Sequence, residues 1–158
     1  MDVIDMHNHF IAPQVIEHLA REGSHYATRI VEREGRRFFL IQEKAMRPIE
    51  GPISNADARL ADMDREGIAR QAVSCVPFLM YPDVDATLGL AIAQVNNDAM
   101  AALARKDPAH FVPLASVPMQ DPSMAAKELE RAAKLGLRGV EIPPKVIERQ
   151  LEIGRAHV

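Results

Sequence analysis

The sequence predicts an α/β fold in which strands and helices alternate along a chain of 158 residues. Two observations indicate this class: short apolar runs rich in β-branched residues, and amphipathic stretches between them at helical spacing. Each predicted helix is long enough to return the chain for parallel strand pairing. Two architectures fit such an alternation, a doubly wound open sheet and a (β/α)₈ barrel. No Gly-x-Gly-x-x-Gly or phosphate loop follows a predicted strand, which disfavours a nucleotide-binding open sheet.

The first predicted strand is VIDMHNHF, residues 3–10. Strict alternation along it places one set of side chains on one face, namely Val3, Asp5, His7 and His9, and the other set on the opposite face, namely Ile4, Met6 and Asn8. Residues 11–54 are expected to be irregular, apart from a small β-hairpin insertion. The hairpin is TRIVEREGRRFFLIQ, residues 28–42, with its turn at Glu34 and Gly35.

The rest of the chain predicts three helices, each followed by a strand. The first helix begins after a cap at Asn55 and ends at Gly67. The later elements, in order, are a strand at 68–78, a helix at 85–106, a strand at 111–119, a helix from about Pro122 to Gly136, and a strand at 137–142. Together with residues 3–10 this gives four predicted strands, which is half of an eight-stranded barrel.

The composition is that of a soluble globular protein, with 47% apolar and 26% charged residues. The net charge is −3 and basic residues form no stripe, which argues against a nucleic-acid partner. Cys75 is the single cysteine and has no internal disulfide partner. No apolar run reaches the length of a membrane span, so no membrane partner is expected. We therefore expect a cytoplasmic protein.

Two histidines at the end of the first predicted strand indicate a metal site. His7 and His9 are separated by one residue, which places their side chains on one strand face with Cα atoms about 6.5 Å apart. Two imidazoles at this spacing can bind one divalent ion. At the carboxyl end of a barrel strand they would face the mouth, where such enzymes carry out chemistry. The alternative is that the histidines are incidental and the chain is a non-catalytic α/β module.

Other residues with reactive side chains carry weaker signals. His18 and His25 are expected to be solvated, and His110 is expected in a loop. Cys75, placed inside an apolar strand, is expected to be a buried, inert thiol. Glu141, near the end of the fourth strand, faces either the mouth or a helix. Arg36 and Arg37 on the hairpin either contact an anionic substrate or are solvated.

Three segments resemble the amidohydrolase superfamily, and in particular the branch of aminocarboxymuconate semialdehyde decarboxylase and related aromatic-acid decarboxylases. They are IDMHNHF, ARLADMDREGIARQAVSCVP, and the run from VNNDAM at residue 95 to RGVEI at residue 142. The resemblance implies the N-terminal half, about four βα units, of a (β/α)₈ TIM barrel with a hairpin insertion. It also implies that His7 and His9 bind a catalytic divalent metal ion, expected to be Zn²⁺. The remaining ligands and the proton-transfer residues are expected on later strands of the barrel, so no catalytic residue is assigned here.

The function expected from this resemblance is a metal-dependent carboxy-lyase acting on a small unsaturated or aromatic carboxylic acid. A hydrolase of the same superfamily, acting on a lactone, ester or amide, is the alternative. In the aminocarboxymuconate enzymes an arginine on the early hairpin binds the substrate carboxylate; the position aligned with it here is Phe39, with Arg36 and Arg37 nearby. A homodimer is expected from the family.

The expected domain covers residues 1–151. The last residues, 152–158 (EIGRAHV), match the translation of a common sequencing adapter and are expected to be a non-native tail, which leaves His157 without a role. A half-barrel would also leave its edge strands unpaired. We therefore expect the isolated chain to be an inactive fragment that associates and binds metal weakly.

Overall fold

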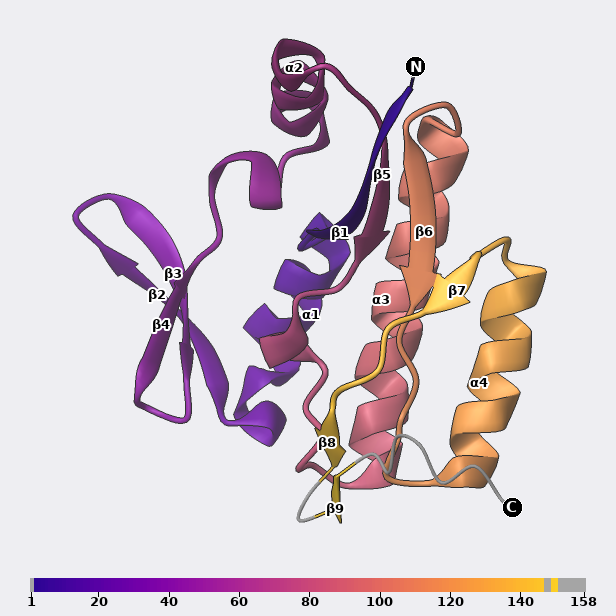
Figure 1. Ribbon diagram of the computed structural model, residues 1–158. Helices are drawn as coiled ribbons and strands as arrows, with labels where there is room; N and C mark the ends of the chain where they lie inside the picture. The colour runs from indigo at the N-terminus through magenta and orange to yellow at the C-terminus, as the bar shows by residue number, and fades with distance from the viewer. Residues whose placement is uncertain (1, 147–148, 151–158) are drawn as a thin grey trace.

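Four parallel strands form the central sheet of the computed structural model, which describes residues 2–146 and 149–150. They are β1 (Val3–His9), β5 (Ile68–Ser74), β6 (Phe111–Ala115) and β7 (Gly139–Val140), and they lie side by side in the order β1-β5-β6-β7 (Figure 1). Each strand therefore pairs with the one that follows it across a helical crossover. This order confirms the predicted α/β class and the half-barrel architecture.

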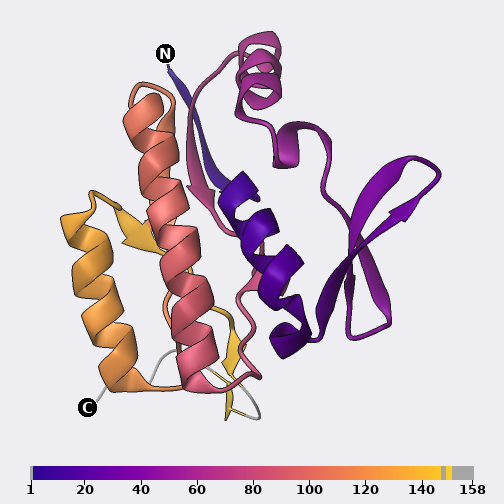
Figure 2. The ribbon, with the colours of Figure 1, turned by 180° about the vertical axis from the view of Figure 1, so that it is seen from behind.

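Three helices cover one face of this sheet, as Figure 2 shows from behind. They are α1 (Pro13–Glu22), α3 (Ala86–Lys106) and α4 (Pro122–Lys134). A further helix, α2 (Ala56–Glu66), precedes β5. In the part of the chain that the structure describes, none of these helices has the length and apolar character needed to cross a membrane.

The three helices that the sequence predicted begin at side-chain caps. Asn55 accepts a hydrogen bond from the Ala58 amide at 3.0 Å, and Asp121 accepts one from the Met124 amide at 2.9 Å. Asp85 caps α3 in the same way. Gly67 ends α2 with a φ of 69°, a left-handed conformation that glycine adopts without strain. The predicted boundaries of these helices are therefore confirmed.

Residues 11–54 are more regular than predicted. They contain α1, and the hairpin of β2 (Thr28–Arg33) and β3 (Arg36–Ile41) gains a third antiparallel strand, β4 (Ala45–Pro48). The expectation of an irregular stretch was wrong for two reasons. Helix α1 follows Ala12 and has no side-chain cap, so it lacks the polar start signal that marks the three predicted helices. Strand β4 contains Pro48, and a proline in the sequence argues against a strand because it has no backbone N–H to donate. An edge strand such as β4 tolerates a proline, because one of its sides has no partner strand.

The strands of the central sheet are shorter than predicted, because the chain leaves the sheet at prolines. Strand β5 ends at Ser74, and Pro77 begins a 3₁₀ turn, η3 (Pro77–Leu79). The other short elements are η1 (Gly23–Tyr26), η2 (Gly51–Ile53), β8 (Lys145–Val146) and β9 (Arg149–Gln150). Residues 152–158, for which a non-native origin was expected, lie outside the described residues.

The core lies between the sheet and the helices. Its fully buried members come from every layer, including Ile11, Leu19, Phe39, Met63, Val73, Ile92 and Met100. Phe39 places the three-stranded sheet against this core, so the hairpin insertion packs on the domain instead of projecting freely. This packing holds the four parallel strands in place, with their carboxyl ends together at one edge of the sheet.

A buried carboxylate joins α3 to α4. Glu128 on α4 is only 2% exposed, and it accepts hydrogen bonds from Asn97 at 2.7 Å and from Arg131 at 2.9 Å. Burial alone would raise the pKa of Glu128, but the hydrogen bonds from Arg131, Asn97 and Gln94 outweigh it and lower the pKa. The folded protein therefore holds Glu128 ionised.

We expect Glu128→Gln to lower the free energy of unfolding by about 2 kcal/mol at pH 7, because the charge-assisted hydrogen bonds are lost. A lowered folded pKa stabilises the protein above the unfolded pKa of about 4.3, and this stabilisation disappears as the pH falls through the folded value. Urea unfolding between pH 7 and pH 3 should therefore show a difference in unfolding free energy between variant and unmodified protein that is constant above about pH 4.3 and narrows below it. Glu130→Gln, an exposed position on the same helix, is the control. A difference that stays constant with pH would contradict this account.

Candidate metal centre at the carboxyl end of the sheet

The end of β1 carries a bulge that sets the direction of its side chains. In the pairing of β1 with β5, Asp5 lies opposite Gln71 and Asn8 lies opposite Val73, so β1 has one residue more than β5 over this interval. Beyond the bulge, His9 lies opposite Ser74. The Asp5 carboxylate hydrogen-bonds the Asn8 side chain at 2.7 Å, which places Asp5 with Asn8. The predicted strict alternation, with Asp5 on the face of the histidines, is therefore wrong, because the extra residue reverses the alternation.

His7 and His9 lie together at the carboxyl end of β1. Their ring centroids are 4.8 Å apart and the rings meet edge to face, at 81°. His7 is exposed and His9 is half-buried. The two side chains predicted as ligands therefore converge at the carboxyl end of β1, and this is the end of a barrel strand that carries functional residues.

Two residues from neighbouring strands approach His9. Ser74, the last residue of β5, contacts Nδ1 of His9 through its hydroxyl at 3.0 Å. Glu141, which directly follows β7, places Oε2 at 3.8 Å from the same nitrogen and accepts a hydrogen bond from the Ser74 hydroxyl. The backbone amide of Glu141 donates to the Ala115 carbonyl at 2.8 Å, which extends the pairing of β7 with β6. Glu141 therefore faces the mouth, an orientation that the sequence left open.

The environment of His9 favours its neutral form. Burial lowers the pKa of His9, and the neighbouring Glu141 carboxylate opposes this only in part. A neutral imidazole is the form that binds a metal ion, because the ligand nitrogen must be free of its proton. The folded structure therefore favours the protonation state of His9 that metal binding requires.

Ligand atoms of His7, His9 and Glu141 all lie within 4.8 Å of one another. Two atoms that each lie about 2.1 Å from one ion are about 3.4 Å apart in a tetrahedral site, so small side-chain rotations bring these three into range. Two imidazoles and one carboxylate are a donor set that divalent metal ions take in proteins. The residues present fit a divalent metal ion.

The predicted substrate contacts on the insertion lie in a different environment. Arg36 is 61% exposed, pairs with Glu50 at 3.3 Å and lies over the ring of Phe38. Arg37 is exposed. Phe39, the position aligned with the carboxylate-binding arginine, is fully buried and cannot contact a ligand.

Arg47 on β4 lies over the ring of Phe78 at 5.8 Å. Phe78 belongs to η3, in the segment that follows the carboxyl end of β5. Among the described arginines of the three-stranded sheet, Arg47 is the one that contacts a loop of this rim. The sequence alone does not predict this contact, because Arg47 and Phe78 are 31 residues apart in the chain.

The other candidate residues do not join this cluster. His25 is exposed, as expected, whereas His18 is half-buried beside the Tyr26 hydroxyl at 3.4 Å and is not fully solvated. His110 lies in the turn before β6, with Nδ1 at 2.9 Å from the Asp107 carboxylate. Cys75 follows the end of β5 and is buried, with a pKa that burial raises to about 12. It is therefore the inert thiol that was expected.

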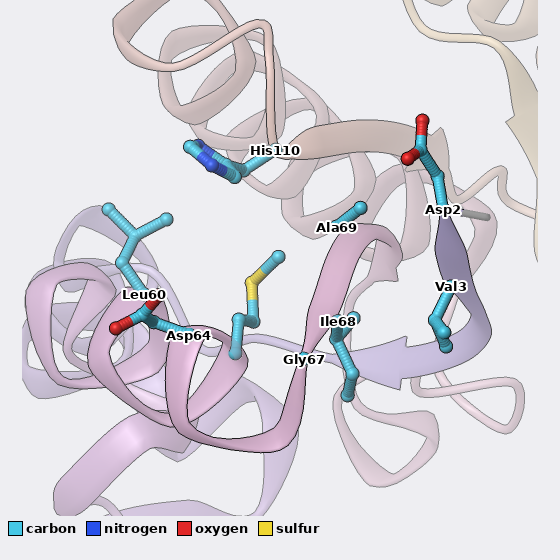
Figure 3. A pocket seen from close by; sticks show the side chains of 9 residues that line it. Asp2, Val3, Leu60, Asp64, Gly67, Ile68, Ala69 and His110 are labelled. Carbon is cyan, nitrogen blue, oxygen red and sulfur yellow. The ribbon is translucent and has the colours of Figure 1, made fainter.

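A hollow of about 540 Å³ opens at the opposite end of the sheet, beside the amino ends of β1 and β5. His110 faces it across from Leu60 and Asp64 of α2, with Asp2 on the β1 side (Figure 3). Barrel enzymes carry their active sites at the carboxyl ends of the strands, and this hollow lies at the other end. The histidine cluster, and not this hollow, is therefore the candidate functional site.

Residues 4–151 match the amidohydrolase family, and the chain belongs to that family. One relative is the 2-amino-3-carboxymuconate-6-semialdehyde decarboxylase of Dictyostelium discoideum, which is 30% identical over 114 residues, covering 72% of this chain and 32% of that protein. The predicted resemblance to the amidohydrolase superfamily and to this decarboxylase branch is confirmed.

Solved structures show the same fold. IDCase from Metarhizium anisopliae in its apo form superposes with a TM-score of 0.78 at 19% identity, covering 95% of this chain and 44% of that chain. The dihydroxybenzoic acid decarboxylase of Polaromonas, with bound manganese and the inhibitor 2-nitroresorcinol, superposes with a TM-score of 0.63 at 28% identity, covering 89% of this chain and 38% of that chain. The chain spans between 32% and 42% of the lengths of the first two curated decarboxylases that it matches.

We expect Cys75 to react with a disulfide reagent such as DTNB only after unfolding, because its thiol is buried and its raised pKa leaves little thiolate at pH 8. The measurement is the release of the coloured thiolate in buffer and in 6 M guanidinium chloride. Rapid, stoichiometric reaction of the folded protein in buffer would show that Cys75 is accessible and would contradict the packing described here.

Proposed function

We propose that the protein is a metal-dependent carboxy-lyase acting on a small unsaturated or aromatic carboxylic acid. The observation that carries the proposal is the convergence of His7, His9 and Glu141 at the carboxyl rim of a half-barrel in a family whose matched relatives are decarboxylases. A cytoplasmic location and a homodimer belong to the same proposal and rest on the composition and the family resemblance.

In this proposal, His7, His9 and Glu141 hold a divalent metal ion. When bound, such an ion would polarise a substrate oxygen and would stabilise the negative charge that remains on the substrate as CO₂ departs and before a proton replaces it. We propose Zn²⁺, since two imidazoles and one carboxylate suit it; the Polaromonas decarboxylase binds manganese, which the same donor types also accept. Ser74 supports the site by fixing the Glu141 carboxylate and the His9 ring through one hydroxyl.

Arginines of the three-stranded sheet are the proposed contacts for the substrate carboxylate. A guanidinium binds a carboxylate through two parallel hydrogen bonds, which orients the acid as well as attracting it. Arg36 and Arg37 were chosen from the sequence. Arg47 is a third candidate, because it is the one that contacts the loop after β5. Separate alanine variants distinguish the three, because loss of the arginine that binds the substrate should raise KM far more than it lowers kcat.

The reaction class is tested by product analysis. The whole enzyme, reconstituted with Zn²⁺ or Mn²⁺, is assayed for CO₂ release from a panel of aromatic and unsaturated acids, and in parallel for opening of lactones, esters and amides. CO₂ release that disappears when the metal is removed supports the carboxy-lyase. Hydrolysis without CO₂ release would establish the hydrolase of the same superfamily instead. Absence of both activities from a metal-loaded enzyme would contradict the proposal.

In the whole enzyme, we expect His7→Ala and His9→Ala each to weaken metal binding by at least about tenfold and to reduce turnover to near background, because each removes a proposed direct ligand. His25→Ala, an exposed histidine near Glu22, is the matched control and should leave both quantities unchanged. Metal content after dialysis and kcat measured on the same samples provide the test. Full metal retention in either ligand variant would show that the ion is bound elsewhere.

A further inference from the structure

A buried cation lies directly behind the two histidines. Arg59, on α2, is 5% exposed, and four acceptors surround its guanidinium. It donates to the Pro52 carbonyl at 3.0 Å and to the Gln71 side chain at 3.0 Å. The other two acceptors belong to β1: the Asn8 side chain and the His9 carbonyl, the latter at 2.5 Å. The guanidinium also lies over the Phe10 ring, at 5.5 Å from its centroid.

These contacts fall on the bulged part of β1. Asp5 accepts a hydrogen bond from the His7 amide at 3.1 Å and one from the Asn8 side chain at 2.7 Å, so its carboxylate spans the bulge. Gln71 on β5 donates to the same carboxylate at 3.3 Å. Asp5, Asn8, Gln71 and Arg59 thus form a closed network that links the backbone of His7 to the backbone of His9.

The bulge determines where the histidines point, because a shift of one residue exchanges the two faces of a strand. Without the bulge, Asp5 and Asn8 would lie on opposite faces of β1. The residues after this point would then change faces relative to Asp5, and His9 would lose its contacts with Ser74 and Glu141. A bulge interrupts the backbone hydrogen bonds of a ladder, so side-chain contacts must replace them. The network around Arg59 supplies these contacts.

We infer that Arg59 and Asp5 are positioning residues for the metal centre: they hold the β1 bulge in the form that directs His7 and His9 toward Glu141. The inference rests on the proposed metal site. Arg59 touches neither ligand side chain, and it acts through the His9 carbonyl and the Asn8 side chain. The Asp5 carboxylate balances the buried guanidinium charge, which would otherwise be costly to desolvate.

The test separates positioning from stability. Arg59→Met removes every donor and keeps an apolar side chain of similar length, and Arg59→Lys keeps the charge without the planar arrangement of donors. Arg65→Met is the matched control, an exposed arginine on the same helix that pairs with Asp62. For each purified protein, Co²⁺ affinity and the visible Co²⁺ spectrum are measured at pH 7.5. Urea unfolding of the metal-free protein gives the stability separately.

We expect Arg59→Met to weaken Co²⁺ binding by about ten- to a hundredfold, the loss typical of residues that orient metal ligands, and to alter the Co²⁺ spectrum. Arg59→Lys should recover part of the affinity, and Arg65→Met should change it less than twofold. A purely structural role would lower the urea midpoint and leave the affinity and spectrum of the folded protein unchanged. That result would overturn the inference.

Asp5→Asn decides the question if Arg59→Met does not fold. This variant keeps the size of the side chain, removes the charge that faces Arg59, and leaves one oxygen where the carboxylate used two to accept from the His7 amide and the Asn8 side chain. We expect the same loss of Co²⁺ affinity, and an unchanged affinity would overturn the inference. Absence of Co²⁺ binding by the unmodified protein is a different result, because it would contradict the proposed metal centre itself.

Discussion

The parallel pairing of β1, β5, β6 and β7 is the constraint on which the rest of the structure depends. Because the four strands run in one direction, their carboxyl ends meet at one rim, and residues far apart in the chain become neighbours there. His9 lies beside Ser74, and Ser74 beside Glu141, although 65 and 67 residues separate them in sequence. In the described residues, the helices and the insertion add no side chain to the cluster of His7, His9 and Glu141. Their role is to bury the other face of the sheet and to fix the strand order.

The chemistry of the rim follows from this arrangement. Burial lowers the pKa of His9 and favours its neutral imidazole, while the Ser74 hydroxyl donates a hydrogen bond to the neighbouring Glu141 carboxylate. The same arrangement leaves β1 at an exposed edge of the sheet. Met6 is 72% exposed and Ile4 is 50% exposed on β1, in a strand that pairs on one side only in the described residues. In a closed barrel, strands at this position pair on both sides.

The sequence predicts those parts of the fold that have local causes. Asn55 and Gly67 mark the ends of α2 through a side-chain cap and a left-handed backbone, and the spacing of His7 and His9 can be read directly from the sequence. The features that the sequence did not predict depend on strand register and on tertiary contacts. A bulge between Asp5 and Asn8 has no sequence signature, and neither does the pairing that places Ser74 beside His9. The position of Arg59 does have a local signature. Arg59 lies four residues before the buried Met63, so a charged residue occupies the apolar face of α2, which indicates a buried, paired arginine.

The central claim is that His7, His9 and Glu141 bind one divalent metal ion at the rim of the sheet. The most direct test is a crystal structure of the Mn²⁺- or Zn²⁺-loaded protein with anomalous diffraction data collected at the metal absorption edge. We expect one strong anomalous peak at about 2.0–2.3 Å from an imidazole nitrogen of each histidine, with a Glu141 oxygen as a third ligand. An anomalous peak at another place in the fold, with His7 and His9 free of metal, would contradict the account.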